Sequence, residues 1–195
     1  MNKIKLFIAL LIGLIASATT MAQTVNMSSY ITLTVTKDAA IRLNLKAAVT
    51  NTPIRIVSGS NTQDITVGTA WTGKRVYNAD GTNMTIYGDL TGFDCSVNVA
   101  KLTALDASKN TQLTVLSCSN NQLTALDVSN NTQLTMLYCS NNQLSSLDVS
   151  KNTQLERLSC GSNNLTSLDV SKNTQLTKLY CGSNKLTTLD VSKNT

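Results

Sequence analysis

The chain has 195 residues, which indicates one or two domains, and a formal net charge of +5 with 14% charged and 4% aromatic residues. It contains no histidine, so the commonest general base and the commonest metal ligand at neutral pH are absent. The positive excess is small, and no basic cluster is interleaved with aromatic residues. A nucleic-acid partner is therefore disfavoured.

The first 22 residues have the pattern of a secretory signal peptide. Lys3 and Lys5 make a positive start, residues 6–16 form an apolar run, and a small-residue cleavage site at 20–22 precedes Gln23. The apolar run is shorter than the roughly 20 residues that a membrane span needs, which disfavours an N-terminal anchor helix. We therefore expect a secreted or cell-surface protein with no membrane span after the leader is cleaved.

Residues 23–89 do not repeat and predict a small β-rich domain. Two segments alternate apolar with polar residues, and this period of two predicts half-buried strands. Further short strands are expected at 53–57, 63–67, 75–77 and 84–87, with a turn at Asp80-Gly81 between the last two. The alternating apolar residues are Ile31, Leu33 and Val35 in the first segment and Ile41, Leu43 and Leu45 in the second.

The remainder of the chain repeats every 21 residues, and a fixed period of this length is the signature of a solenoid. Each unit has two similar halves that share the skeleton L-x-x-L-x-(V/C)-x-x-N. A degenerate first unit begins at Leu90 and carries two extra residues around 99–101, which predict a loop bulge. The leucines that open the later units are Leu102, Leu123, Leu144, Leu165 and Leu186.

Within a unit, apolar residues two positions apart point to the same side of an extended chain. Leu116 and Cys118 therefore point inward, and Leu126 and Val128 do the same in the other half. One coil then has two extended sides joined by two turns, which leaves little room for a helix. We predict a mainly β fold, in which a β-rich N-terminal cap domain precedes a solenoid of about five parallel β coils over residues 90–195.

The first coil of a solenoid exposes a hydrophobic end that needs a capping unit, so capping is the favoured role of residues 23–89 and ligand binding is the alternative. The single tryptophan, Trp71, allows the same two interpretations. An exposed Trp71 indicates a sugar or protein site, whereas packing at the edge of the cap is the favoured alternative.

Two asparagines recur in every unit, and stacked coils place equivalent residues in columns about 4.8 Å apart. An asparagine amide can bond backbone groups of its own turn and of the next coil, so both columns are interpreted as structural. One column holds Asn121, Asn142, Asn163 and Asn184, and the other holds Asn110, Asn131, Asn152, Asn173 and Asn194.

The cysteines follow the same spacing and predict a ladder of buried free thiols. Neighbouring Cα atoms lie within the disulfide range, but parallel Cβ vectors hold the sulfurs side by side, which disfavours bonding. A linear column does not offer the tetrahedral cluster that zinc prefers, and a buried apolar thiol without a histidine is a poor nucleophile. The ladder consists of Cys95, Cys118, Cys139, Cys160 and Cys181.

A row of aspartates also stacks, and carboxylates about 5 Å apart repel one another. One interpretation is cation binding along the row. The other is that hydroxyls, backbone N–H groups and a lysine column offset the charge, and it is favoured because the glycine-rich calcium-binding signature is absent. We therefore predict no metal and no cofactor. The row holds Asp106, Asp127, Asp148, Asp169 and Asp190, and the lysine column holds Lys109, Lys151, Lys172 and Lys193.

The positions that vary between units flank the inward leucine of the second half and point to solvent. Variation inside a fixed frame marks the surface that a solenoid can specialise for a ligand, and Tyr and Arg are enriched in binding hot spots. Drift on an unselected surface is the alternative. The candidate binding residues are Met136, Tyr138, Arg157, Lys178 and Tyr180.

The unit L-T-x-L-D-V-S-x-N-T-Q-L-T-x-L-x-C-x-x-N resembles the cysteine-ladder leucine-rich repeat of internalin-like bacterial surface proteins, over residues 85–195. The resemblance implies a right-handed leucine-rich-repeat solenoid and an adhesin-type binding protein without enzymatic activity. The sequence stops inside a repeat at Thr195, so we expect an uncapped last coil.

Two functions are compatible with these features. The first is binding of an extracellular protein or glycan, including one on a host surface, through the variable face. The second is a structural surface protein whose open last coil pairs edge to edge, giving a monomer or a weak end-to-end oligomer. No nucleophile–base pair supports an enzyme.

Overall fold

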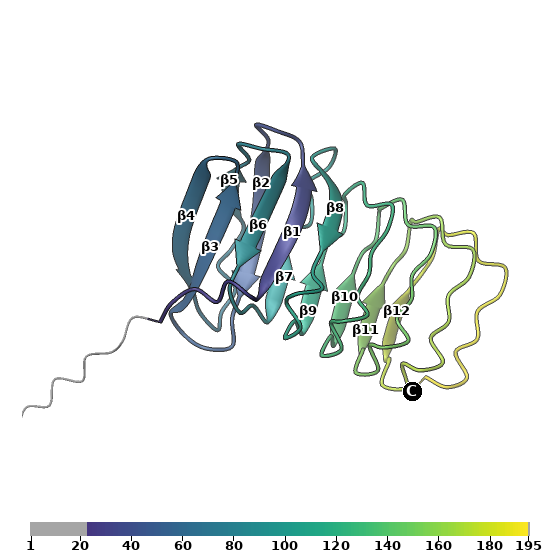
Figure 1. Cartoon of the computed structure of the whole chain (residues 1–195). Helices are drawn as coiled ribbons and strands as arrows, with labels where there is room; N and C mark the ends of the chain where they lie inside the picture. Colours follow the sequence, from purple (N-terminus) through teal and green to yellow (C-terminus); the bar gives the residue numbers. More distant parts are fainter. Residues whose placement is uncertain (1–22, 195) are drawn as a thin grey trace, which may run out of the picture.

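The computed structural model describes residues 23–194, so the predicted leader at 1–22 and the final Thr195 lie outside the described residues. Within that range the chain forms twelve strands in two sheets (Figure 1), and no helix is found. Accordingly, this part of the chain holds no helix long and apolar enough to cross a membrane. The mainly β solenoid predicted from the repeats is confirmed.

The five-stranded sheet is antiparallel throughout, in the order β4-β3-β6-β1-β8. Its inward side chains are those of the predicted alternation, because Ile31, Leu33 and Val35 are all buried. The strands are β1 (Tyr30–Val35), β3 (Thr52–Ser58), β4 (Asn61–Val67), β6 (Asn83–Tyr87) and β8 (Leu102–Asp106).

The seven-stranded sheet has the order β12-β11-β10-β9-β7-β2-β5. From β7 to β12 its strands are parallel, with one short strand from each coil, whereas β2 pairs antiparallel with both β7 and β5. Figure 1 shows the coils stacking away from the cap toward the C-terminal end. The strands are β2 (Ala40–Lys46), β5 (Arg75–Asn78), β7 (Gly92–Asp94), β9 (Val115–Ser117), β10 (Met136–Tyr138), β11 (Arg157–Ser159) and β12 (Lys178–Tyr180).

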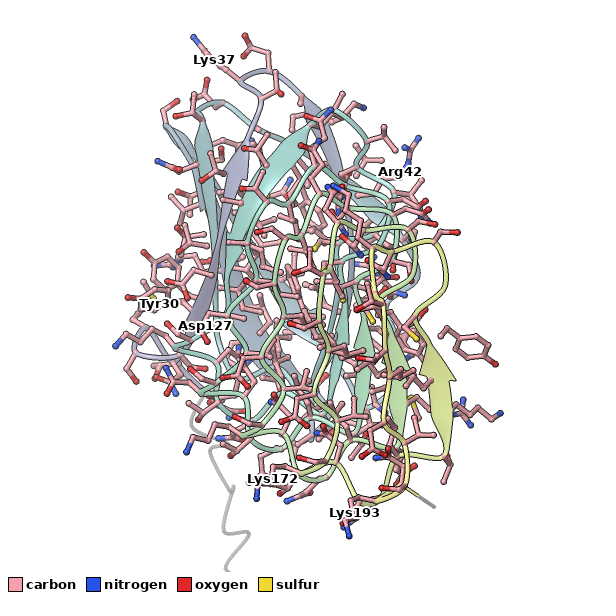
Figure 2. The ribbon with its side chains drawn as sticks, turned by 90° about the vertical axis from the view of Figure 1, so that its right-hand side faces the viewer. Tyr30, Lys37, Arg42, Asp127, Lys172 and Lys193 are labelled. Atoms are coloured by element: carbon pink, nitrogen blue, oxygen red, sulfur yellow. The ribbon has the colours of Figure 1, made fainter. Side chains whose placement is uncertain are left out.

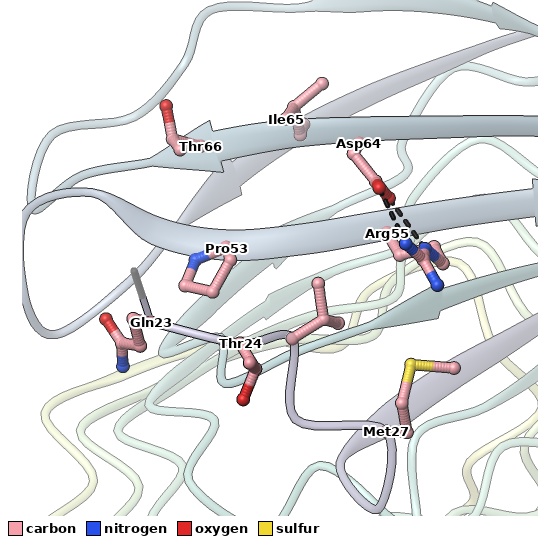
Figure 3. Close-up of a pocket in the computed structure, with 9 residues that line it drawn as sticks. Gln23, Thr24, Met27, Pro53, Arg55, Asp64, Ile65 and Thr66 are labelled. Carbon is pink, nitrogen blue, oxygen red and sulfur yellow. Dashed lines mark hydrogen bonds and ion pairs between the residues drawn. The ribbon is translucent and has the colours of Figure 1, made fainter. Parts of the chain in front are cut away.

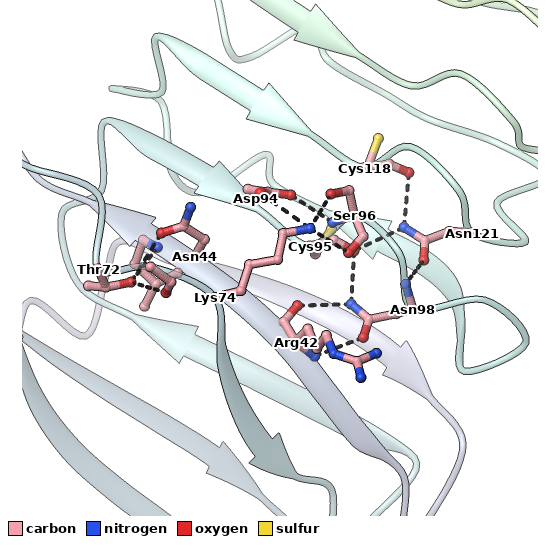
Figure 4. Close-up of polar contacts among 12 residues, drawn as sticks. Arg42, Asn44, Thr72, Lys74, Asp94, Cys95, Ser96, Asn98, Cys118 and Asn121 are labelled. Atoms are coloured by element: carbon pink, nitrogen blue, oxygen red, sulfur yellow. Dashed lines mark hydrogen bonds and ion pairs between the residues drawn. The ribbon is translucent and has the colours of Figure 1, made fainter.

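The cap takes the place of the coil that would precede the first repeat. Asn98 Nδ2 donates to the carbonyl of Arg42 in β2 at 2.9 Å, where later asparagines of the same column donate to the coil before them (Figure 4). In the other column, Asn110 Nδ2 donates to the Gly88 carbonyl at 3.0 Å. The cap therefore accepts hydrogen bonds from both asparagine columns at the first coil, and its inward side chains join the same hydrophobic core.

The asparagine columns hold the coils together as expected, with one correction. Asn131 Nδ2 donates to the carbonyls of Ala107 and Asn110 at 3.0 and 2.8 Å, and both acceptors belong to the preceding coil rather than the next one. Asn142 Nδ2 likewise bonds Cys118 of the preceding coil and Cys139 of its own turn, both at 3.0 Å. Each column thus links a coil to the one before it.

The two sides of a coil differ, although the sequence suggested similar extended halves. Leu126 and Val128 are buried as predicted, but their segment forms no strand. On this side Asn142 Oδ1 accepts the Leu123 N–H at 3.0 Å. The Gln143 N–H in turn donates to the Leu123 carbonyl at 2.8 Å. Side-chain amides therefore replace a continuous backbone ladder there.

The turn expected at Asp80-Gly81 does lie between β5 and β6. These two strands belong to different sheets, because β5 pairs with β2 whereas β6 pairs with β1 and β3. The turn thus carries the chain from one layer of the cap to the other. The inward side chains of both layers join those of the coils in one hydrophobic core.

Candidate functional site

The outer face of the seven-stranded sheet presents two rows of side chains, aligned because the strands of the coils pair in register. Neighbouring positions in a row lie about 4.8 Å apart. The first row, in strand order from the cap, is Lys46, Gly92, Val115, Met136, Arg157 and Lys178. The second row is Asn44, Asp94, Ser117, Tyr138, Ser159 and Tyr180.

The five residues predicted from their variation lie together on this outer face. Met136, Tyr138 and Arg157 are half-buried by their neighbours, whereas Lys178 and Tyr180 on β12 are exposed, Tyr180 to 62%. The Tyr138 hydroxyl lies 3.4 Å from the Met136 sulfur, which holds the two side chains of β10 against each other. The three strands thus build one continuous patch.

The charges of the patch are positive and unneutralised. Arg157 and Lys178 are direct partners on neighbouring strands, where like charges repel. In the described part of the chain neither forms an ion pair, and the exposed Glu156 next to Arg157 forms none either. The free protein therefore holds two adjacent cations that an external anion would stabilise.

Trp71 packs at the edge of the cap, and its ring also lies on the outer face. A Cβ built on Gly92 would lie 2.7 Å from the Cη2 atom of the indole and 3.0 Å from Cζ2. Gly92 is buried beneath the ring, while Trp71 itself is 38% exposed. The contact between Trp71 and Gly92 was not predicted from the sequence. A signal for it was present, because Gly92 occupies the position that holds Val115 or Met136 in later coils.

The segment that carries Trp71 is fastened to the sheet by the residues that follow the ring. Thr72 N donates to the Leu45 carbonyl at 3.0 Å, and Leu45 N donates to the Thr72 hydroxyl at 3.0 Å. Lys74 Nζ donates to Ser96 Oγ at 2.7 Å and lies 3.7 Å from an Asp94 carboxylate oxygen (Figure 4). These bonds fix the direction in which Trp71 leaves the backbone.

The cysteines are free, and four of them are fully enclosed by the core, while Cys181 in the last strand-bearing coil is half-buried. Burial raises the pKa of the Cys160 thiol to about 12, and it also raises the pKa values of Cys95, Cys118 and Cys139. At neutral pH these thiols are protonated and act as small apolar side chains.

The aspartate row caps turns. Asp148 Oδ1 accepts the Ser150 N–H at 2.8 Å, and this backbone hydrogen bond is the main reason that the pKa of Asp148 lies below its usual value. Repulsion from Asp169 acts in the opposite direction and is weaker. In Figure 2, Asp127 lies on the side of the molecule that carries Tyr30, away from Arg42 of the seven-stranded sheet. Across the described residues, no group of three His, Cys, Asp or Glu could hold a metal ion.

An open pocket of about 740 Å³ lies between residues 23–27 and the β3–β4 hairpin (Figure 3). Its two charged residues neutralise each other, because Arg55 Nε and Nη2 donate to the two carboxylate oxygens of Asp64 at 2.7 and 2.6 Å. This hydrogen bonding lowers the pKa of Asp64. The pocket offers no unpaired charge to a ligand, unlike the outer face of the other sheet.

Comparison with known proteins gives matches over the repeats. A family model described as leucine-rich repeats (two copies) matches residues 111–152 and again 153–194. A search of curated protein sequences gives no match.

Solved structures that are similar to part of the chain include two internalins. The functional domain of InlJ from Listeria monocytogenes, which includes a cysteine ladder, aligns with 54% of this chain at 47% identity and a TM-score of 0.51. An internalin, InlF, from the same species aligns with 44% of this chain at 30% identity and a TM-score of 0.41. The chain covers only 23% of the InlJ structure and 26% of the InlF structure.

The 21-residue period, the in-register parallel strands and the column of free cysteines agree with the family match and with the likeness to InlJ. Residues 111–194 are therefore built of leucine-rich repeats, and the repeated part of the chain is similar to the cysteine-ladder domain of InlJ.

Proposed function

We propose that this protein is an exported binding module that engages an extracellular protein or glycan through the outer face of its seven-stranded sheet. The observation that carries the proposal is the gathering of the varied side chains of three successive coils on one face, with two unneutralised cations among them. The residues that do not vary between coils pack in the core or form the hydrogen bonds of the turns. The leader pattern in the sequence supports export.

Binding without catalysis fits the chemistry of the described residues. The thiols enclosed in the core are protonated at neutral pH, and the chain has no histidine to activate a nucleophile. The outer face combines tyrosine, methionine and arginine, which are side-chain types enriched in protein interfaces. We therefore assign the face to recognition.

The test is a binding screen of the labelled chain against arrays of extracellular protein domains and of glycans. Changing Tyr138→Ala and Tyr180→Ala together should abolish binding to any ligand found, without lowering Tm. The matched control removes two tyrosines from the opposite sheet, Tyr30→Ala with Tyr87→Ala, whose rings lie 5.7 Å apart. Binding that survives loss of Tyr138 and Tyr180 would show that the outer face is not the site.

End-to-end assembly is a second candidate, favoured by one observation. The last described coil leaves Leu189 and Val191 exposed, and an open hollow of about 210 Å³ lies between Leu176, Leu179 and Val191. A second copy, or a further coil, would cover this surface. Size-exclusion chromatography at several concentrations separates the candidates, because assembly predicts an apparent mass that grows with concentration and a binding module alone does not.

A further inference from the structure

The indole of Trp71 extends the outer face from the coils onto the cap. It lies over Gly92, which pairs with Val115 on one side and with Lys46 on the other. Gly92 has no side chain to place in the first row. The Trp71 ring, which comes from a different segment, fills that position. The row continues without a gap from Lys46 in the cap to Lys178 in the last parallel strand.

The segment around Trp71 is ordered by contacts that lie away from the exposed part of the ring. Gly68 accepts the Ala47 N–H at 2.9 Å, Thr72 bonds Leu45 through both its N–H and its hydroxyl, and Lys74 is anchored at Ser96. An aromatic ring already held in place loses little conformational entropy when a partner covers it. Trp71 thus has the properties of a preorganised anchor.

The row has an apolar centre and cationic ends. Trp71, Val115 and Met136 occupy its middle, and Tyr138 lies beside Met136 in the second row. At one end stands Lys46, and at the other stand Arg157 and Lys178. Asp94 is the one acidic residue in the two rows, and its carboxylate is paired with Lys74. It therefore does not neutralise the positive charges at the two ends of the first row.

This arrangement selects among partners. An interface with an apolar centre and charged ends fits a protein segment that buries apolar side chains and carries carboxylates on either side of them. An anionic glycan would instead favour cations along the whole row, where this row has valine and methionine at its centre. The repulsion between Arg157 and Lys178 is relieved when a carboxylate approaches them.

We propose that Trp71 belongs to the binding surface and that the partner is an acidic protein segment with apolar side chains, seated along the first row from Lys46 to Lys178. This inference rests on the proposed function of the outer face. It adds a contact from the cap and the charge class of the ligand, neither of which follows from the repeats alone.

The experiment uses the full chain and a random twelve-residue peptide library displayed on phage, with tryptophan excluded from the library. Trp71 is then the sole tryptophan of the complex, so its fluorescence reports directly on a bound peptide. Selected peptides should be more acidic than the starting library, should contain apolar residues, and should change the Trp71 emission. Their affinities are measured by isothermal titration calorimetry on synthetic copies.

Four variants, one of them a control, test the parts of the inference. Trp71→Ala, with Trp71→Leu as a milder change, should weaken binding roughly ten-fold or more, as expected for an aromatic anchor. Arg157→Glu with Lys178→Glu should weaken it by at least a similar factor. The control, Lys172→Glu with Lys193→Glu, makes the same charge change at an edge of the molecule, as Figure 2 shows. If the partner binds the cations of the outer face, this control should change the affinity by no more than about two-fold.

The outcomes separate this inference from the function on which it rests. In one outcome, the selected peptides lose affinity with Tyr138→Ala and Tyr180→Ala, but they are neutral or basic and bind both Trp71 variants as tightly as the parent protein. That result supports the outer face as the binding site and overturns the inference. Peptides indifferent to every outer-face variant overturn both. Failure to recover any peptide, or a response of Trp71 only to a sulfated polysaccharide such as heparin, overturns the assignment of an acidic protein segment.

Discussion

Trp71 occupies the space that a side chain at Gly92 would need. Gly92→Ala should therefore push the indole away from the sheet, because the new Cβ would lie 2.7 Å from ring atom Cη2. The ring is the free end of a side chain and can move, so we expect a red shift of its fluorescence with only a small loss of stability. Emission spectra and thermal melts measure both effects.

The matched control is Gly68→Ala in the same segment, where a Cβ would meet nothing within 4 Å. This variant should keep the emission of the parent protein. An unchanged emission maximum in Gly92→Ala would show that the ring does not lie over residue 92.

Val97 stands in the left-handed region of backbone conformation, with φ of +66°. The equivalent residues of later coils are Asn120, Asn141, Ser162 and Ser183, with φ between +53° and +57°. Asparagine tolerates this conformation and a β-branched residue does not, so Val97→Asn should stabilise the fold by about 1 kcal/mol. Urea unfolding measures the difference.

The control for this change is Val99→Asn in the same loop. Val97 and Val99 are 45% and 58% exposed, so both substitutions remove a similar exposed side chain, but only Val97 has a positive φ. Equal effects of the two changes would mean that backbone strain is not the cause.

Asn131 and Asn130 are neighbours with opposite roles. Asn131 is fully buried and its amide donates to two carbonyls of the preceding coil, whereas Asn130 is exposed. Asn131→Ala removes both of these hydrogen bonds, while each carbonyl keeps one backbone donor, so it should lower the free energy of unfolding by about 2 kcal/mol. Asn130→Ala should change it by less than about 0.5 kcal/mol, and a similar loss in both variants would refute the structural role of the column.

The thiol ladder makes stability depend on alkaline pH. Burial raises the pKa of Cys160 from 9.0 to about 12, so between these values the unfolded chain loses the proton and the folded chain keeps it. The folded state then binds more protons than the unfolded state, and stability falls as pH rises, by about 1.4 kcal/mol per pH unit for each such thiol. Unfolding by urea at pH values from 8 to 11 measures this slope.

Cys139→Ala should make the alkaline slope shallower because it removes one of the buried thiols. A thiol-reactive chromogenic reagent gives an independent measurement at pH 8. We expect Cys181 to react first and the four enclosed thiols to react only after denaturation. Detection of no thiols in the denatured protein would contradict the ladder of free cysteines.

The repeated part of the fold could be predicted from the sequence because each residue stacks on the equivalent residue of the neighbouring coil. A 21-residue period places Leu116 beneath Leu137 and Cys118 beneath Cys139 without knowledge of the rest of the chain. The outward position of Tyr138 follows from the same alternation. The strands of the cap were also predictable from their period of two, as the burial of Ile31 and Leu33 shows.

The pairing within the cap did not follow, because no local pattern encodes it. Nothing near Asp80 tells that β5 and β6 enter different sheets, or that β8 pairs with β1 rather than with another coil. Packing of Trp71 at the edge of the cap was predicted, but its contact with Gly92 was missed for the same reason. Its neighbour Gly92 lies 21 residues further along the chain, and only the folded structure brings the two together.

The most direct test of the account is hydroxyl-radical footprinting of the chain with and without a partner recovered in the binding screen. Trp71, Met136, Tyr138 and Tyr180 are side chains that this method reads, and all four lie on the outer face. Their oxidation should fall when the partner binds, while that of Met27, which is exposed away from this sheet beside the β3–β4 hairpin, stays unchanged. Protection of Met27 with continued oxidation of Tyr138 and Tyr180 would contradict the central claim that the varied residues of the coils form the binding surface.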